Sequence, residues 1–244
     1  MKKTIQTKLL EINRLFYDRY SGSFSATRSR VQPGVRKFLG QIDKMDRVLD
    51  VGCGNGTLAR ALAVAGFAGE YVGVDMSKEL ISRAESLLGN PQEGTYHFQQ
   101  VDLEDKGWHE TLTGLPYDWL VSFAVLHHLP GEDLRSQTAT AFAKLVSQQS
   151  RVAISVWQWH HSERLRKRVQ PWSLVGVLPE DVDKADVLLD WRAGKTLGLR
   201  YVHTFNEESL QTLAEEAGFN VLQSFYSDGK TNDLALYQIW ELAV

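Results

Sequence analysis

The feature that most constrains the fold is a short apolar run followed by three closely spaced glycines. Residues 48–51 (VLDV) are typical of a buried strand, residues 52–56 (GCGNG) of a tight turn, and residues 57–65 of a helix that ends at Gly66. Because glycine has no side chain, a ligand can approach the backbone of such a turn closely. This order of elements predicts an open α/β sheet that binds an adenosine cofactor at the turn.

The spacing of the glycines separates two kinds of cofactor. The dinucleotide spacing is G-x-G-x-x-G, whose third glycine would fall on Thr57, whereas this chain has G-x-G-x-G with Asp50 two residues before it. A pyrophosphate needs helix N–H groups aimed at it. S-adenosylmethionine carries a sulfonium and no phosphate, so a carboxylate beside the turn is favourable. VLDVGCGNG resembles the first motif of class I S-adenosylmethionine-dependent methyltransferases; the alternatives are a turn without a nucleotide and an altered NAD site.

Length and composition set further limits. The 244 residues suit one α/β domain with an extra segment, and 43% hydrophobic and 23% charged residues are ordinary for a globular protein. No run of eighteen apolar residues or signal-peptide core is present, so we expect no membrane partner. The single cysteine, Cys53, excludes an internal disulfide and favours a reducing, cytoplasmic compartment.

The net charge of −3 argues against a general nucleic-acid binder, but the charge is unevenly distributed. Residues 1–50 carry +6 and residues 151–200 carry +3, whereas residues 51–150 and 201–244 carry −6 each. Such a separation can mark the face that meets an anionic partner. An uneven solvated surface explains it equally well.

Acidic residues follow the next two predicted strands. Asp75 ends the strand at 72–74 and lies nineteen residues after Gly56, where an acid hydrogen-bonds ribose hydroxyls in such folds. Asp102 and Leu103 follow the third predicted strand, residues 96–101. The methyltransferase resemblance implies that Asp102 accepts from the adenine amino group, that Leu103 backs the ring, and that Met76 lies beside the cofactor.

The fourth predicted strand, residues 117–124, runs into the pair His127 and His128. Neighbouring residues of an extended segment point to opposite sides, and no cysteine or acid stands at zinc spacing, so we expect no metal site. We expect one histidine beneath the cofactor and the other facing the methyl acceptor; either could take either place, and His128 is a candidate catalytic residue.

Two segments lie outside the predicted sheet. An N-terminal helical arm, residues 1–45, begins with a helix at 4–20 that we expect to break at Ser21-Gly22-Ser23. The resemblance implies that this arm covers the cofactor, with Tyr17 and Arg28 as candidate contacts. Residues 158–200 are predicted to be an insertion between strands five and six, rich in tryptophan and arginine. Aromatic and basic side chains together suit a nucleotide, although a solvated amphipathic helix gives the same pattern.

Several stretches together are similar to the eukaryotic tRNA wobble-uridine carboxymethyl methyltransferases. These stretches are YDRYSGSFSATR (17–28), VLDVGCGNG (48–56), FAVLHHL (123–129), LRYVHTFNEESLQTLAEEAGF (199–219) and SFYSDG (224–229). The sequence departs from that family at residues 28–33 and 230–233, both on the acceptor side. The resemblance implies tRNA as substrate and a small activator protein as partner. Arg200, His203 and Arg28 are candidates to orient an anionic acceptor, although each could equally be a structural hydrogen-bonding residue.

The chemistry agrees with this resemblance. A carboxylate with a pKa near 4 is already ionised at neutral pH, so its methylation needs no general base. A phenol or amine would need one, and His127 or His128 would be the candidate. We therefore expect residues 1–244 to form a single Rossmann-like class I methyltransferase domain, with a seven-stranded, mostly parallel sheet and helices on both faces. The alternatives are a small-molecule methyltransferase and a non-catalytic methyltransferase-like subunit.

Overall fold

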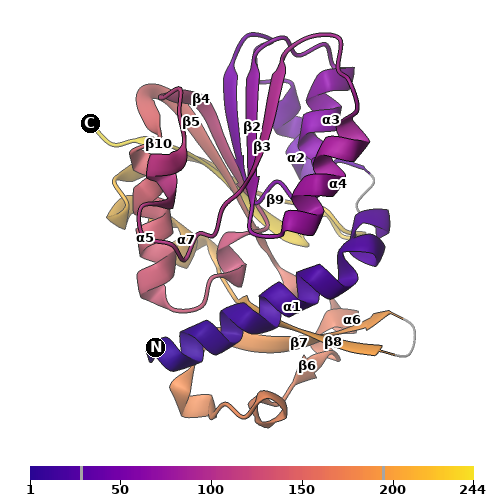
Figure 1. The fold of residues 1–244 in the computed structure, drawn as a ribbon. Coiled ribbons are helices and arrows are strands. Elements are labelled where there is room, and N and C mark those ends of the chain that lie inside the picture. The colour runs from indigo at the N-terminus through magenta and orange to yellow at the C-terminus, as the bar shows by residue number, and fades with distance from the viewer. Residues whose placement is uncertain (28–29, 194–195) are drawn as a thin grey trace.

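The computed structural model describes residues 1–27, 30–193 and 196–244, which are built around a seven-stranded sheet (Figure 1). Its strands are β1 (Arg47–Val51), β2 (Glu70–Asp75), β3 (Thr95–Gln100), β4 (Tyr117–Phe123), β5 (Val146–Trp157), β9 (Phe219–Ser227) and β10 (Ala235–Leu242). They lie in the order β3-β2-β1-β4-β5-β10-β9, and β10 alone runs antiparallel to its neighbours. The sequence-based fold class is confirmed.

Helices cover both faces of this sheet, as Figure 1 shows. On one face lie α2 (Pro33–Leu39), α3 (Thr57–Val64) and α4 (Lys78–Leu88), and on the other lie α5 (Glu132–Ala143) and α7 (Glu207–Glu216). Each face has its own apolar core, because the central strands bury side chains on both sides. Among the described residues, no helix combines the length and hydrophobicity that crossing a membrane requires.

The segment between β5 and α7 folds into a second sheet rather than a long amphipathic helix. Its described residues form one turn of α-helix, α6 (Glu163–Arg166), followed by β6 (Val169–Gln170), β7 (Asp186–Ala193) and β8 (Thr196–His203). The three strands are antiparallel and lie in the order β6-β7-β8. A small core of Trp159, Leu165, Leu189 and Val202 supports them.

The N-terminal helix α1 (Lys3–Thr27) is longer than the sequence predicts, because it continues through the expected break at Ser21-Gly22-Ser23. Figure 1 shows α1 lying between the large sheet and the second sheet. Its aromatic side chains pack on β8 at Gly198, where an added Cβ would lie 2.6 Å from the Tyr20 ring and 3.1 Å from the Phe16 ring. This packing stabilises helical residues whose local propensity is poor.

Candidate functional site

The glycine turn after β1 forms the base of the site. Gly52, Gly54 and Gly56 have φ angles of +79°, +57° and +70°, a region that residues with a side chain rarely adopt. A Cβ on Gly52 would also lie 2.2 Å from Cγ2 of Val125. The amides of Gly52 and Cys53 both donate to the carbonyl of Val74, at 2.7 and 3.0 Å, and so hold the turn against β2.

Two carboxylates flank this turn, the buried Asp50 and the partly buried Asp75. The Asp75 oxygens accept from the amides of Gly54 (3.0 Å) and Ser77 (2.9 Å), which fixes the carboxylate at the end of β2. Asp50 accepts a 2.6 Å hydrogen bond from the hydroxyl of Tyr71. Burial raises the pKa of Asp75 above its usual value and raises that of Asp50 to about 7. Both carboxyls are therefore placed where a cationic ligand would favour their charged form.

A cavity of about 420 Å³ opens above the turn at the carboxyl ends of the strands, the edge at which open α/β sheets bind ligands. Most of the residues predicted from the sequence line it, namely Tyr17, Asp50, Gly52, Cys53, Gly54, Asp75, Met76, Asp102, Leu103, His128 and Arg200. Gly56 is not in the lining and caps the start of α3 instead. Arg28 lies outside the described residues. His203 lines a different cavity.

Asp102 has an additional partner that the sequence did not suggest. One of its oxygens pairs with the guanidinium of Arg14 from α1 at 2.5 Å, and the other accepts from the amide of Glu104 at 3.0 Å. Each carboxylate oxygen has a further lone pair, so an adenine amino group can still be accepted. The ion pair also links α1 to the rim of the cavity.

The two histidines differ in their hydrogen bonds. Nδ1 of His128 lies 3.1 Å from the carbonyl of Tyr201, and its Nε2 lies 2.7 Å from the hydroxyl of Tyr17. Because a carbonyl only accepts, Nδ1 carries the proton in the neutral ring and Nε2 accepts from Tyr17. Nδ1 of His127 accepts from the amide of Trp157 at 3.2 Å. Both rings line the cavity.

Arg200 is a buried cationic residue of the cavity lining, which also contains Arg30. Only 4% of this residue is exposed, although it carries a permanent charge. Its guanidinium carbon lies 4.7, 4.9 and 5.3 Å from the ring centroids of Phe16, Trp157 and Trp191. Aromatic faces attract a guanidinium, and the planar N–H edge of a guanidinium is the group that recognises a carboxylate. An anion that enters this cavity therefore meets an oriented, largely desolvated arginine.

His203 does not join Arg200, because residues three apart on a strand face opposite sides. Its Nδ1 lies 2.7 Å from Oδ1 of Asp186, which also accepts from the hydroxyl of Tyr201 at 2.7 Å. Asp183, Asp186 and His203 lie close enough to hold a metal ion. Arg135 already pairs with Asp183 at 3.2 Å, and a buried guanidinium there disfavours a second cation.

Two residues from distant parts of the chain also line the cavity and were not predicted from the sequence. Asn13 on α1 is buried and makes three hydrogen bonds to backbone atoms of His128 and Tyr201. Asp228, in the turn between β9 and β10, accepts from the amide of Gly34 and the hydroxyl of Tyr237. The sequence signal that could have pointed to Asn13 is its position: it is a polar residue at a place where the helical spacing predicts an apolar one.

Comparison with known sequences agrees with this geometry. A family model described as a methyltransferase domain matches residues 24–224. The tRNA (carboxymethyluridine(34)-5-O)-methyltransferase of Schizosaccharomyces pombe is 24% identical, over 86% of this chain and 89% of that protein. The protein of the same name from Arabidopsis thaliana is 30% identical over 64% of this chain, but only 35% of its own length is matched. A ubiquinone biosynthesis O-methyltransferase of Hydrogenovibrio crunogenus is 31% identical over 45% of this chain and 44% of that protein.

Solved structures share the fold. An S-adenosylmethionine-dependent methyltransferase from Methanosarcina mazei superimposes with a TM-score of 0.65 and 19% identity, over 88% of this chain and 99% of that one. A methyltransferase solved with the Trm112 methyltransferase activator of Haloferax volcanii gives a TM-score of 0.66 and 14% identity, over 95% of this chain and 97% of that one. With the cavity and its glycine turn, these matches place the chain in the methyltransferase domain family, as an S-adenosylmethionine-dependent enzyme.

Proposed function

We propose that this methyltransferase esterifies the carboxylate of a carboxymethylated wobble uridine in tRNA. The observation that carries the proposal is Arg200, a buried guanidinium that lines the cofactor cavity among three aromatic rings. A planar guanidinium binds a carboxylate through two parallel hydrogen bonds. The names of the relatives from S. pombe and A. thaliana support the same acceptor.

The polar groups of the cofactor cavity match those that S-adenosylmethionine presents. We assign the ribose hydroxyls to Asp75, the cationic amino-acid portion to the side of Asp50, and the adenine ring to the rim with Asp102 and Leu103. When bound, the cofactor supplies an electrophilic methyl group on a sulfonium. The chain's own contribution is alignment, since an ionised carboxylate attacks without losing a proton. Arg200 holds the carboxylate, and the Tyr17–His128 hydrogen bond fixes the wall beside it.

The partners follow from the same proposal. Exposed basic residues of α6 and its surroundings offer contacts for RNA phosphates. We also propose a small activator protein as a second partner, supported by the fold shared with the Haloferax volcanii complex. A cytoplasmic location agrees with a tRNA substrate and with the single cysteine, whose thiol has no partner for a disulfide.

A small-molecule O-methyltransferase is the second candidate, favoured by the apolar residues of the cavity and by the similarity to a ubiquinone biosynthesis O-methyltransferase. A phenol acceptor needs a base, and Nε2 of His128 already accepts a hydrogen bond from Tyr17. This arrangement disfavours His128 as a general base, so we rank a carboxylate acceptor above a phenol.

The test is methyl transfer from labelled S-adenosylmethionine to tRNA that carries 5-carboxymethyluridine at the wobble position. We expect an ester that mild alkali removes, and no transfer to the same tRNA with unmodified uridine. In cells that lack the gene, mass spectrometry of tRNA nucleosides should show the free acid accumulating and the ester lost. Turnover of a phenol, with no transfer to the tRNA, would replace this proposal with the second candidate.

A further inference from the structure

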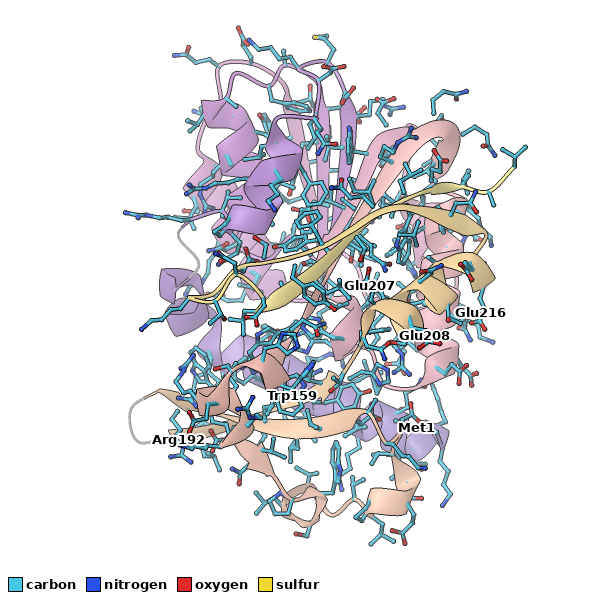
Figure 2. The ribbon with its side chains drawn as sticks, turned by 180° about the vertical axis from the view of Figure 1, so that it is seen from behind. Met1, Trp159, Arg192, Glu207, Glu208 and Glu216 are labelled. Atoms are coloured by element: carbon cyan, nitrogen blue, oxygen red, sulfur yellow. The ribbon has the colours of Figure 1, made fainter. Side chains whose placement is uncertain are left out.

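The cavity wall around Arg200 is built from two different sheets. Arg200 lies on β8 of the second sheet, whereas His128 ends the short helix η2 (Leu126–His128), which follows β4 of the large sheet. Figure 1 shows α1 and the second sheet together below the large sheet, and Figure 2 shows them from behind, with Arg192 on the second sheet and Met1 before α1. The place of Arg200 relative to the glycine turn therefore depends on how β8 is joined to η2.

One amide side chain bridges β8 and η2. Nδ2 of Asn13 on α1 donates to the carbonyl of His128 at 3.1 Å and to that of Tyr201 at 3.2 Å. Its Oδ1 accepts from the amide of Tyr201 at 2.8 Å, and only 3% of Asn13 is exposed. In the part of the chain that the structure describes, no backbone hydrogen bond joins η2 directly to β8. Asn13 is thus a buried link between the backbones of two elements that carry residues of the cavity wall.

The groups that Asn13 meets match a carboxamide. Tyr201 lies on the free edge of the second sheet, whose order is β6-β7-β8, so its N–H and C=O point away from the ladder with β7. A carboxamide has one acceptor oxygen and two N–H donors, and here it meets one N–H and two carbonyls. A carboxylate would instead place an oxygen against both carbonyls. Asn13 therefore supplies the partners that a further strand would supply, and it fixes the backbone next to Arg200.

The same side of α1 also contacts the side chains on either side of this bridge. The hydroxyl of Tyr17, one turn after Asn13, lies 2.7 Å from Nε2 of His128. The ring of Phe16 lies 4.7 Å from the guanidinium carbon of Arg200. Because residues three and four apart lie on one side of a helix, a single face of α1 holds both His128 and Arg200.

We propose that Asn13 is a positioning residue for methyl transfer, which sets the place of Arg200 relative to the cofactor by bridging β8 to η2. The inference rests on the proposed function above. In-line transfer from a sulfonium requires that the carboxylate and the methyl group be aligned, and a displacement of about 1 Å can slow such a step about a hundredfold. A shift of β8 moves the carboxylate through Arg200, while the glycine turn and Asp75 keep the cofactor in place.

The test is a double-mutant cycle between Asn13 and Arg200 in the full chain. The variants are Asn13→Ala, Arg200→Ala and the pair, and the assay is methylation of an anticodon stem–loop with 5-carboxymethyluridine at the wobble position. Calorimetric titration with S-adenosylhomocysteine gives the cofactor affinity and the fraction of competent protein, so rates are compared per competent site. The matched control is Ser150→Ala, which removes a buried 2.6 Å hydrogen bond to the carbonyl of Tyr117 at the amino-terminal end of β4, away from the cavity.

We expect Asn13→Ala to lower kcat/KM for the stem–loop about tenfold, with a cofactor affinity within about twofold of the wild type. In the Arg200→Ala background the same substitution should cost less than about twofold, because the group that it positions is gone. Ser150→Ala should lose stability and keep the wild-type rate per competent site. Losses that multiply in the double variant, or a control that loses as much activity as Asn13→Ala, would overturn the positioning role.

Asn13→Gln covers the case in which Asn13→Ala does not fold. It keeps the amide donors and acceptor but lengthens the side chain by one methylene, so the bridge can form only with β8 displaced. We expect a lower rate that again depends on Arg200. A wild-type rate would show that the place of β8 does not depend on this amide, and would overturn the proposal.

A measurement without an acceptor separates this inference from the proposed function. NMR of the histidine ring nitrogens reports which nitrogen of His128 carries the proton, and the Tyr201 carbonyl held by Asn13 favours Nδ1. We expect the Nδ1 form in the wild type and a mixture of both forms in Asn13→Ala. If the stem–loop is methylated but the losses multiply, only the positioning role is wrong. If the wild type does not methylate it, the proposed function is wrong, and an unchanged His128 spectrum in Asn13→Ala then overturns the bridge as well.

Discussion

The buried carboxyl of Asp50 makes the stability of this protein depend on pH in a direction opposite to that of most carboxylates. Its pKa is raised from 3.8 to about 7 in the folded chain, chiefly by burial, while the Tyr71 hydroxyl bonds it and opposes the rise. Replacing it by the isosteric amide, Asp50→Asn, keeps an acceptor for Tyr71 and removes the titration. We expect the variant to be more stable than the wild type at neutral and alkaline pH.

The magnitude follows from the two pKa values. About three pKa units at about 1.4 kcal/mol each correspond to about 4 kcal/mol of free energy of unfolding, as an order of magnitude. Because the folded-state pKa is the higher one, the folded protein binds the proton more tightly. The protonated carboxyl therefore contributes its full stability below about pH 4, and that contribution is lost as the pH rises to about 7.

Urea unfolding of the cofactor-free protein, repeated across this pH range, measures the difference between Asp50→Asn and the wild type. We expect a difference near zero at pH 4 that grows to at most about 4 kcal/mol above pH 7. Tyr71→Phe is the control: without the bond that favours the carboxylate, the transition should move to higher pH. A difference that is constant with pH, or that grows on acidification, would refute the assigned role of burial.

Three further predictions concern the cavity. Gly52→Ala places a methyl group 2.2 Å from Val125 in a left-handed backbone, so calorimetry should show cofactor affinity at least about tenfold weaker, partly restored by Val125→Ala. Arg200→Lys should lower kcat/KM for the carboxylate acceptor about tenfold, and Arg200→Ala about a hundredfold, while the affinity for the cofactor stays unchanged. A loss of cofactor affinity as large as the loss of kcat/KM would contradict the acceptor role. Asn13→Leu removes three hydrogen bonds to the backbone and should lower the urea-measured free energy of unfolding by about 3 kcal/mol; no loss would show that α1 is held without them.

The cofactor half of the cavity was predictable because its determinants are local. A glycine turn and an acid at the end of the next strand are both visible within thirty residues, and the structure brings Gly52, Gly54 and Asp75 together as expected. The length of α1 was not predictable, since helical residues near Ser21 depend on packing against Gly198, far along the chain. Local propensity yields to such contacts.

The part of the cavity that we assign to the methyl acceptor, around Arg200, was only partly predictable, for a related reason. The segment 158–200 has basic and aromatic residues without clear alternation, so β7 and β8 were not recognised as strands. Once β8 is known, its two-residue period places Arg200 and His203 on opposite faces. Family resemblance singled out both residues but could not separate a side chain in the cofactor cavity from one bonded to Asp186.

The contact between α1 and β8 also has a consequence for the order in which the molecule is assembled. Asn13 bonds Tyr201 across 188 positions of sequence, so during synthesis the N-terminal helix waits until nearly the whole chain has emerged. Strands β1 to β5, which all precede Tyr201 in the chain, can pair first, and α1 docks once β8 has formed. Elements that dock late at the edge of a fold also tend to open first, so we expect the amides of α1 to lose hydrogen-exchange protection before those of β1 and β4.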